Sequence, residues 1–234
     1  MARKKPYDDG CATAHALDLI GERWALLIVR ELIPGPKRFS DLRAALPGIS
    51  TNILTTRLTE LEAGHVLVRA KLPPPAASQV YALTHWGAEL EPLIKDLGRW
   101  AAKSPELAPG KPMSAASVML SFRTMFNAER ARGLDLEALL VLNAVPHRVR
   151  VTGGVLDIAP GQATAPDFTL DGDPDLVAGL VYGGLSLEAV REAGLKTQGD
   201  AALIKRFAAL FPLPEKAKAT AARQQPRRCK TAPP

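Results

Sequence analysis

Apolar residues in the first hundred positions recur at the three- and four-residue spacing of amphipathic helices. One stripe, which Pro34 ends, contains Trp24, Leu27, Ile28 and Leu32. The same spacing, interrupted by proline, glycine and serine, predicts helices over residues 14–20, 22–32, 39–46 and 50–63. Ser50 is expected to cap the last of these helices, and Gly64 lies just past its end.

The spacing then changes from helical to alternating, which is typical of strands. Residues 66–71 and 79–83 predict a hairpin whose proline-rich loop is residues 72–78. Thr84 is expected to cap a helix to about Ala102, bent at Pro92. Its apolar positions are Leu90, Leu93, Ile94, Leu97 and Ala101. Helices, then a hairpin, then a helix, with a Pro47-Gly48 turn before the helix over residues 50–63, is the order of a winged helix-turn-helix.

The helix over residues 50–63 is the candidate DNA-reading helix. Its apolar stripe, expected to face the core, is Ile53, Leu54, Leu58 and Leu61. The opposite face carries Asn52, Thr55 and Thr59, flanked by Thr51 and Thr56. These short side chains are polar and uncharged, and asparagine and threonine can contact base edges. The helix N-terminus also favours a nearby phosphate group.

Basic and polar residues flank this helix where a winged helix meets the DNA backbone. Lys37, Arg38 and Arg43 come before it, and Arg69 and Lys71 lead into the hairpin loop. Arg57 lies near the core stripe, so a phosphate contact and an internal salt bridge are both open. The predicted DNA-contacting set is Lys37, Arg38, Arg43, Ser50, Thr51, Asn52, Thr55, Thr56, Arg57, Arg69, Lys71, Ser78 and Gln79. The alternative is a solvated face of a protein-interaction module.

Several blocks resemble the HxlR-type winged-helix regulators, in order and in spacing. They are CATAHALDLIGERW (11–24), RFSDL (38–42), GIS (48–50), LTTRL (54–58) with Leu61-Glu62, YALT (81–84) with Gly87, and Trp100. The resemblance covers residues 11–102. It implies a homodimer on a pseudo-palindromic operator, with the first and last helices of this region forming the interface. The wing departs from the family, because PPPAAS (73–78) lacks the charged residues often found there.

Five further side chains of this region could have either a functional or a purely structural role. The resemblance implies that Cys11 is a redox-sensor candidate, because some relatives use a cysteine at this position in that way. The alternative is a small buried residue, since reactivity requires a lowered thiol pKa. Trp24 and Trp100 are expected to pack, and His65 and His85 are expected to be exposed at the boundaries of elements.

The second half of the chain mixes helical and strand-like segments. A stripe of Val118, Phe122, Met125 and Phe126, with Met119 beside it, predicts a helix over residues 114–132 that Gly133 ends. Strands are predicted at residues 139–142, 149–151, 155–158, 168–170 and 195–197, with Gly153-Gly154 as a hairpin turn. Further helices are predicted at residues 173–181, 186–193 and 200–211. The pattern predicts an α+β domain with a mixed or antiparallel sheet covered by helices.

Residues 114–213 resemble the sterol carrier protein-type lipid-binding domain. The blocks are VLDI (155–158) with Gly161, DFTLDGD (167–173), Gly183, Ala193-Gly194, and TQGD (197–200) with Phe207 and Phe211. The resemblance implies an apolar tunnel between sheet and helices. The candidate ligand-binding residues are Met119, Phe122, Phe126, Leu140, Phe168 and Phe207. The alternative is that these side chains fill an ordinary core.

The net charge of +6 is concentrated near the C-terminus. Six basic residues and one acidic residue follow Leu213, in a segment almost without large apolar side chains. This composition predicts a disordered basic tail over residues 214–234. Residues 104–112, rich in proline, are expected to be a linker. The predicted domains are therefore residues 1–103, mainly helical, and residues 113–213.

Other classes of function have little support in the sequence. The chain has no Ser-His-Asp set, Cys-His set or phosphate loop, so we expect neither an enzyme nor a cofactor. The histidines and the two cysteines lack metal-ligand spacing, and the aspartates around Gly172 lack the later glutamate of a calcium loop. No apolar run reaches the ~18–20 residues of a membrane span. The N-terminus lacks the apolar core of a signal peptide, so a cytoplasmic location is expected.

The sequence favours a bacterial-type transcriptional regulator that binds double-stranded DNA as a homodimer. An apolar or lipid-like ligand in the second domain is expected to modulate it. The alternative is a lipid or small-molecule carrier whose winged helix mediates protein contacts. A pure interaction module would not need a polar, uncharged helix face with basic flanks, which favours the regulator.

Overall fold

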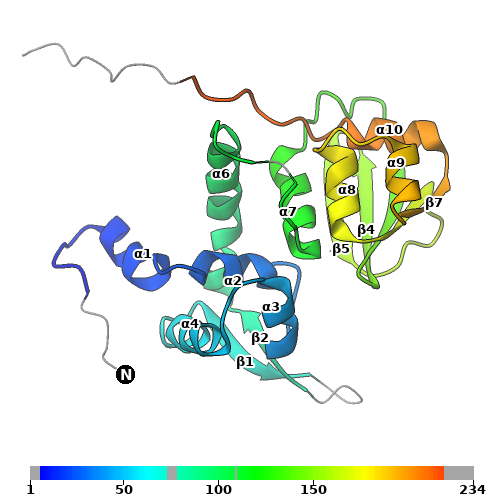
Figure 1. The fold of residues 1–234 in the computed structure, drawn as a ribbon. Coiled ribbons are helices and arrows are strands. Elements are labelled where there is room, and N and C mark those ends of the chain that lie inside the picture. Colours follow the sequence, from blue (N-terminus) through cyan, green and yellow to red (C-terminus); the bar gives the residue numbers. More distant parts are fainter. Residues whose placement is uncertain (1–5, 73–77, 109, 219–234) are drawn as a thin grey trace, which may run out of the picture.

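The computed structural model describes residues 6–72, 78–108 and 110–218 and divides the chain between two hydrophobic cores. Figure 1 shows a helical part, here called the head, beside a second part in which helices lie on a sheet. The head comprises the elements up to Lys103, and the sheet domain comprises the elements from Ser114 to Phe211. The proline-rich loop residues 73–77 and the tail residues 219–234 lie outside the described residues.

The head combines helices with one antiparallel hairpin. Its helices are α1 (Ala12–Ile20), α2 (Ala25–Leu32), α3 (Phe39–Ala45), α4 (Thr51–Ala63), α5 (His85–Ala88) and α6 (Leu90–Ala102). The hairpin strands are β1 (Leu67–Lys71) and β2 (Gln79–Leu83). Lys37 bridges to Tyr81 on the outer side of β2, so the segment before α3 extends the hairpin. The predicted order of elements is confirmed, with differences in three places.

The first two differences are at the ends of helices. The helix predicted from Glu22 begins at Ala25, because Trp24 takes a left-handed backbone conformation with φ of 82°. A single helix from Thr84 to Ala102, bent at Pro92, is also wrong. The chain forms α5 and then α6, and Pro92 lies in the first turn of α6, where a missing N–H costs no hydrogen bond. Gly87 of α5 touches the hairpin, since a Cβ there would lie 1.9 Å from the carbonyl oxygen of Val66.

The third difference concerns which side chains of the helices are buried. Ile53 was expected in the core but is 42% exposed, while Leu54, Leu58 and Leu61 are buried as expected. Trp100 was expected to pack but is 72% exposed in the single chain. Both side chains lie at the edge of an apolar stripe, where a helical wheel cannot decide between core and surface.

The sheet domain begins with a helix that is shorter than predicted. Its helices are α7 (Ala115–Met125), α8 (Pro174–Val181), α9 (Leu187–Glu192) and α10 (Ala201–Ala208). The helix predicted to end at Gly133 stops at Phe126, which has an extended ψ of 131°. Phe126 thereby packs on Phe211, which itself lies past the end of α10 and not within it. Contacts between these distant segments end both helices earlier than their apolar spacing suggests.

The sheet is mixed, with the strand order β5-β4-β3-β6-β7. Its strands are β3 (Leu136–Leu142), β4 (Val145–Thr152), β5 (Val155–Pro160), β6 (Phe168–Gly172) and β7 (Lys196–Gly199). β3 and β6 are parallel, and the other neighbours are antiparallel. The predicted turn at Gly153-Gly154 joins β4 to β5, and both glycines have a positive φ, as a tight hairpin requires.

The core of the sheet domain is rich in aromatic contacts. Phe122 stacks on Phe211 with ring centroids 4.3 Å apart and meets Phe207 edge-on at 5.6 Å. Phe168 of β6 lies 5.3 Å from Phe207. All four rings are almost fully buried. Since these rings contact one another between α7, α10 and the sheet, they fill the interior of the domain.

The two parts meet through a buried carboxylate. Glu31 of α2 is fully buried and accepts from Lys37 Nζ at 2.9 Å and from Arg30 Nη2 at 2.8 Å. Ser114 Oγ, from the other side of the linker, donates to the same carboxylate at 2.6 Å. Ser114 also caps α7, because its Oγ accepts from Ser117 N. One carboxylate therefore connects the head to the first helix of the sheet domain.

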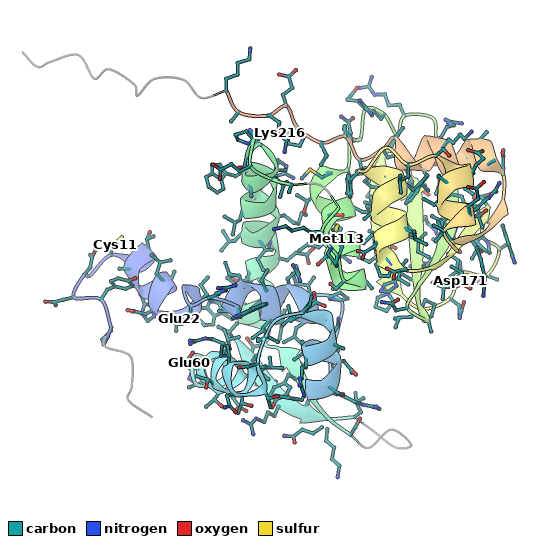
Figure 2. All side chains as sticks on the ribbon, viewed as in Figure 1. Cys11, Glu22, Glu60, Met113, Asp171 and Lys216 are labelled. Atoms are coloured by element: carbon teal, nitrogen blue, oxygen red, sulfur yellow. The ribbon has the colours of Figure 1, made fainter. Side chains whose placement is uncertain are left out.

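Helices α6 and α7 stand side by side at this junction (Figure 1). Arg123 of α7 pairs with Glu91 of α6 at 2.9 Å, and Arg99 of α6 donates to the carbonyl oxygen of Thr124. The chain after α10 then returns to the head. Lys216 Nζ, labelled in Figure 2, donates to the carbonyl oxygens of Ala102 and Ser104 at the C-terminal end of α6.

The return of the chain corrects the prediction of a tail that is disordered from residue 214. Residues 214–218 run to the end of α6, where Ala217 N also donates to Lys103 O at 2.7 Å. A lysine ammonium at a helix C-terminus satisfies free carbonyl groups and complements the helix dipole. The rest of the predicted tail, residues 219–234, lies outside the described residues.

We expect Glu31→Gln to lower the free energy of unfolding by about 3 kcal/mol, as when one partner of a buried ion pair is removed. The loss falls at the low end of that range because Arg30 and Lys37 remain partly exposed to water. Urea denaturation of the full chain measures it. Asp96→Asn is the control, because it removes an exposed pair with Arg99 and should cost less than about 1 kcal/mol. Equal losses in the two variants would contradict the role given to Glu31.

Candidate nucleic-acid interface

Helix α4 is fixed to the head by one face and presents the other to solvent. Leu54, Leu58 and Leu61 are buried in the head core. Ser50 caps the helix, as predicted, and its Oγ accepts from Ile53 N at 3.3 Å. Asn52, Thr55 and Thr59 are exposed on the opposite face. The helix is therefore held rigidly while a polar, uncharged face remains accessible.

The threonine hydroxyls of α4 are already used as hydrogen-bond donors. Thr55 Oγ1 donates to Thr51 O at 2.9 Å, Thr59 Oγ1 to Thr55 O at 3.0 Å, and Thr56 Oγ1 to Asn52 O at 2.9 Å. In this arrangement the hydroxyl oxygens can still accept a hydrogen bond. The face therefore combines the amide of Asn52, which can donate and accept, with hydroxyls that accept.

Lys37 and Arg38, both predicted phosphate contacts, have partners inside the head. Lys37 is paired with the buried Glu31, and its backbone bridges to Tyr81. Arg38 Nε donates to Ser78 Oγ at 2.9 Å and so connects the start of α3 to the wing. Arg38 thus joins α3 to the wing through its side chain, whereas Lys37 reaches the hairpin through its backbone and α2 through its side chain.

Arg57 and Arg69 also form ion pairs. Arg57 pairs with Glu22 at 3.1 Å and with Glu60, which favours the internal salt bridge among its two open interpretations. Figure 2 labels Glu22 and Glu60 near α4. Arg69 pairs with Glu62 at 3.0 Å and lies over the ring of Tyr81.

Arg43 and Lys71 differ from these cations. Both are exposed, and within residues 6–72, 78–108 and 110–218 neither has an ion pair. Gln79, at the base of the wing opposite Lys71, is exposed as well. The exposed polar face of α4, together with Arg43 of α3 and Lys71 of β1, is here called the α4 surface.

Cys11 lies at the start of α1, apart from the α4 surface (Figure 2). Its thiol is exposed, which contradicts the interpretation of Cys11 as a small buried residue. Hydrogen bonds from the backbone and hydroxyl of Thr13 and from the backbone of Ala14 lower the pKa of this thiol. These three donors stabilise the thiolate at the N-terminus of a helix. Cys229 lies outside the described residues.

The predicted ligand-binding residues are brought together, but in the packed core. Phe122, Phe168 and Phe207 belong to the aromatic cluster, and Leu140 is fully buried beneath it. Phe126 is half-buried at its edge. Met119 differs, because it also lines a cavity of about 190 Å³ between the two parts of the chain. The packing of the aromatic rings favours the alternative that these side chains fill an ordinary core.

The described residues contain no group of three or more histidine, cysteine, aspartate or glutamate side chains that could hold a metal ion. His65 and His85 are exposed, as expected. His147 is buried in β4, and burial lowers its pKa, which favours the neutral ring. No helix in the described part of the chain is long and apolar enough to cross a membrane.

Sequence comparisons agree with this geometry of the head. A family model described as HxlR-like helix-turn-helix matches residues 19–107. The uncharacterized HTH-type transcriptional regulator YvaP of Bacillus subtilis is 39% identical over 88 residues, which are 38% of this chain and 82% of that protein. This chain belongs to the HxlR family. The prediction of a winged helix-turn-helix in the N-terminal part is thereby confirmed.

Other HxlR relatives match the same part of the chain. The HTH-type transcriptional regulator YodB of B. subtilis is 37% identical over 86 residues, covering 37% of this chain and 77% of that protein. The solved structure of reduced YodB is 34% identical and covers 43% of this chain and 99% of that one, with a TM-score of 0.38. The relatives named here are transcriptional regulators and not enzymes. Each covers less than half of this chain.

Two features of the structure were missed in the sequence. In the sequence, Glu31 resembles any other polar residue of an amphipathic helix. Its partner Ser114 lies 83 positions away, so no local pattern connects the two residues. The last helix was expected in a dimer interface, but its exposed face of Leu93, Leu97 and Trp100, at a spacing of four and three residues, was not separated from its packed face. That spacing, together with the tryptophan, was the signal that could have separated this face from Leu90 and Ile94.

We expect the alkylation rate of Cys11 to reach its midpoint at a lower pH than that of an unperturbed thiol. The N–H and hydroxyl donors at the start of α1 favour the thiolate, which is the reactive form. The measurement is iodoacetamide alkylation as a function of pH in a Cys229→Ser background, with the same protein in urea as control. The same midpoint in the folded and unfolded protein would show that the helix start does not activate Cys11.

Proposed function

We propose that this protein is a transcriptional regulator that binds double-stranded DNA, with α4 in the major groove. The exposed face of Asn52, Thr55 and Thr59, on a helix whose opposite face is buried, carries the proposal. Asparagine recognises adenine through two hydrogen bonds, and threonine contacts either base edges or the thymine methyl group. Membership of the HxlR family supports it, because the relatives named above are HTH-type transcriptional regulators.

The cations of the head have two roles in this proposal. Arg43 and Lys71 contact phosphates, because their charges are not balanced by an ion pair within the described residues. Lys37, Arg38, Arg57 and Arg69 keep the recognition helix and the wing in register through their internal partners. Ser50 and Thr51, at the N-terminus of α4, offer backbone N–H groups to a phosphate. Thr56, Ser78 and Gln79 border the contact.

The same proposal includes a homodimer formed through α6, with α1 at its edge. Leu93, Leu97 and Trp100 are 60%, 48% and 72% exposed and lie on one face of α6. Leu17 of α1 is also exposed. The contacts of α7 leave this face of α6 uncovered. A contiguous apolar stripe of this kind is typical of an interface, and two copies related by a twofold axis would cover it.

The sheet domain is the second unit in this proposal, at residues 113–213, following a linker at residues 104–112. Its likeness to sterol carrier proteins stays a prediction from sequence blocks. The carrier hypothesis, with a lipid inside the domain, is disfavoured by the contacts among Phe122, Phe168, Phe207 and Phe211. The domain is better suited to regulate the head through the junction of α2, α6 and α7 than to hold a long acyl chain.

We expect the variant with Asn52→Ala and Thr55→Ala to lose sequence preference, at a cost of about 1–3 kcal/mol for each base-specific interaction that it removes. Selection of bound duplexes from a random pool, followed by competition binding, measures this. The variant with Arg43→Ala and Lys71→Ala should instead weaken binding to all sequences and flatten the salt dependence by about two counterions. Arg132→Ala, in the sheet domain, is the control. Unchanged preference after the α4 substitutions would refute the assignment of this helix.

We expect Leu97→Asp to convert the dimer into a monomer in sedimentation analysis at micromolar concentration. A carboxylate buried in an apolar interface without a partner is strongly unfavourable. The matched control is Val155→Asp on β5, because Val155 is 67% exposed but lies outside the α6 face. A wild-type chain that sediments as a monomer would contradict the proposed interface.

A further inference from the structure

A cavity of about 190 Å³ lies where the head meets the sheet domain. Ile33 and Pro34, just past α2, form its wall on the head side. Ala116 and Met119 of α7 form a second wall, and Ile158 and Ala159 of β5 form a third. Three elements from distant parts of the sequence therefore line one space that is partly open to solvent. This space lies apart from the aromatic core and from the α4 surface.

The polar groups on the cavity wall are engaged elsewhere. Arg123 uses both terminal nitrogens, one on Glu91 at 2.9 Å and the other on Ile158 O at 2.7 Å. His147 Nδ1 lies 3.0 Å from Val145 O, and burial lowers the pKa of the ring, which favours its neutral form. The remaining wall is made of aliphatic, methionine and proline side chains. A ligand with a net charge would therefore lose its hydration without gaining a free partner.

The volume of the cavity limits the size of the ligand. An engineered apolar cavity of about 150 Å³ in another protein binds benzene. A cavity of about 190 Å³ is thus large enough for one aromatic ring with a small substituent. A lipid chain or a sterol would not fit without movement of the two parts. The size of this cavity therefore excludes an acyl chain or a sterol from it, while its apolar lining suits a small apolar ring.

We infer that the junction cavity, formed by Ile33, Ala116, Met119 and Ala159, binds one small uncharged single-ring aromatic molecule. Such a ligand contacts both parts of the chain, so it stabilises the arrangement in which they are joined. The inference deepens the proposed function, because it names the effector class of the regulator and rests on that function only for its biological meaning. Binding itself is independent of DNA.

The test is a titration of the full chain with toluene, followed by NMR of methyl-labelled methionines. The chain has four methionines, and Met119 lines the cavity while Met125 does not. We expect a saturable shift of the Met119 methyl signal, assigned with Met119→Leu, and little change at Met125. At a tenfold excess over Kd, the thermal midpoint should rise by roughly 3–6 °C.

Two substitutions fill the cavity from opposite sides. Ala116→Phe acts from α7 and Ile33→Trp acts from the head, and each should abolish the shift that toluene causes in the wild type. Val155→Phe, on β5 but outside the cavity, is the matched control and should bind as the wild type does. The use of both filling variants keeps the test decisive if one of them fails to fold.

Three outcomes would overturn the inference. The first is no saturable shift at Met119. The second is an unchanged response in a folded filling variant. The third is a shift at Met125 as large as that at Met119, which would place the ligand in the core of the sheet domain. A protein that binds toluene as expected but selects no DNA sequence would refute the proposed function and leave the binding site intact.

Discussion

The buried carboxylate of Glu31 is the interaction on which the arrangement of the two parts depends. A fully buried charge needs several partners, and this one has Arg30, Lys37 and the hydroxyl of Ser114. Each partner belongs to a different structural unit: α2 itself, the segment that bridges to the wing, and the cap of α7. Because desolvation makes every one of these contacts necessary, the carboxylate fixes the wing and the sheet domain to the same helix.

The internal pairing of cations shapes how the head can meet DNA. Three of the six basic residues that the sequence placed near the DNA, Lys37, Arg57 and Arg69, neutralise carboxylates of the head. Charges that are paired attract phosphates less, so binding without sequence preference is weakened. In the proposed complex, the polar face of α4 then carries a larger share of the interaction with DNA. A regulator must discriminate its operator from other DNA, and this division favours discrimination over general affinity.

The sequence predicted the local features of the fold and missed those that depend on distant contacts. Ser50 and Thr84 cap the helices that follow them, as expected, because a cap involves side chains and backbone only a few residues apart. The end of α7 was missed, because Phe126 is drawn to Phe211 and leaves the helix. The exposed polar face of α4 was predicted from the spacing of apolar and polar residues alone. The partners of Glu31 could not be found in this way, since Glu31 and Ser114 meet only in the folded chain.

The position of the cavity follows from the same architecture. Each part of the chain completes its own core, and the cavity lies where the two packed surfaces meet. A ligand inside the aromatic core would have to displace stacked rings, whereas a ligand at the junction only occupies existing space. In the proposed regulation, a ligand at the junction biases the docking of α7 against α2 and α6, the elements that hold Glu31 and the exposed α6 face. By reciprocity, any DNA complex that favours one docking of these helices must also change the affinity of the cavity for its ligand.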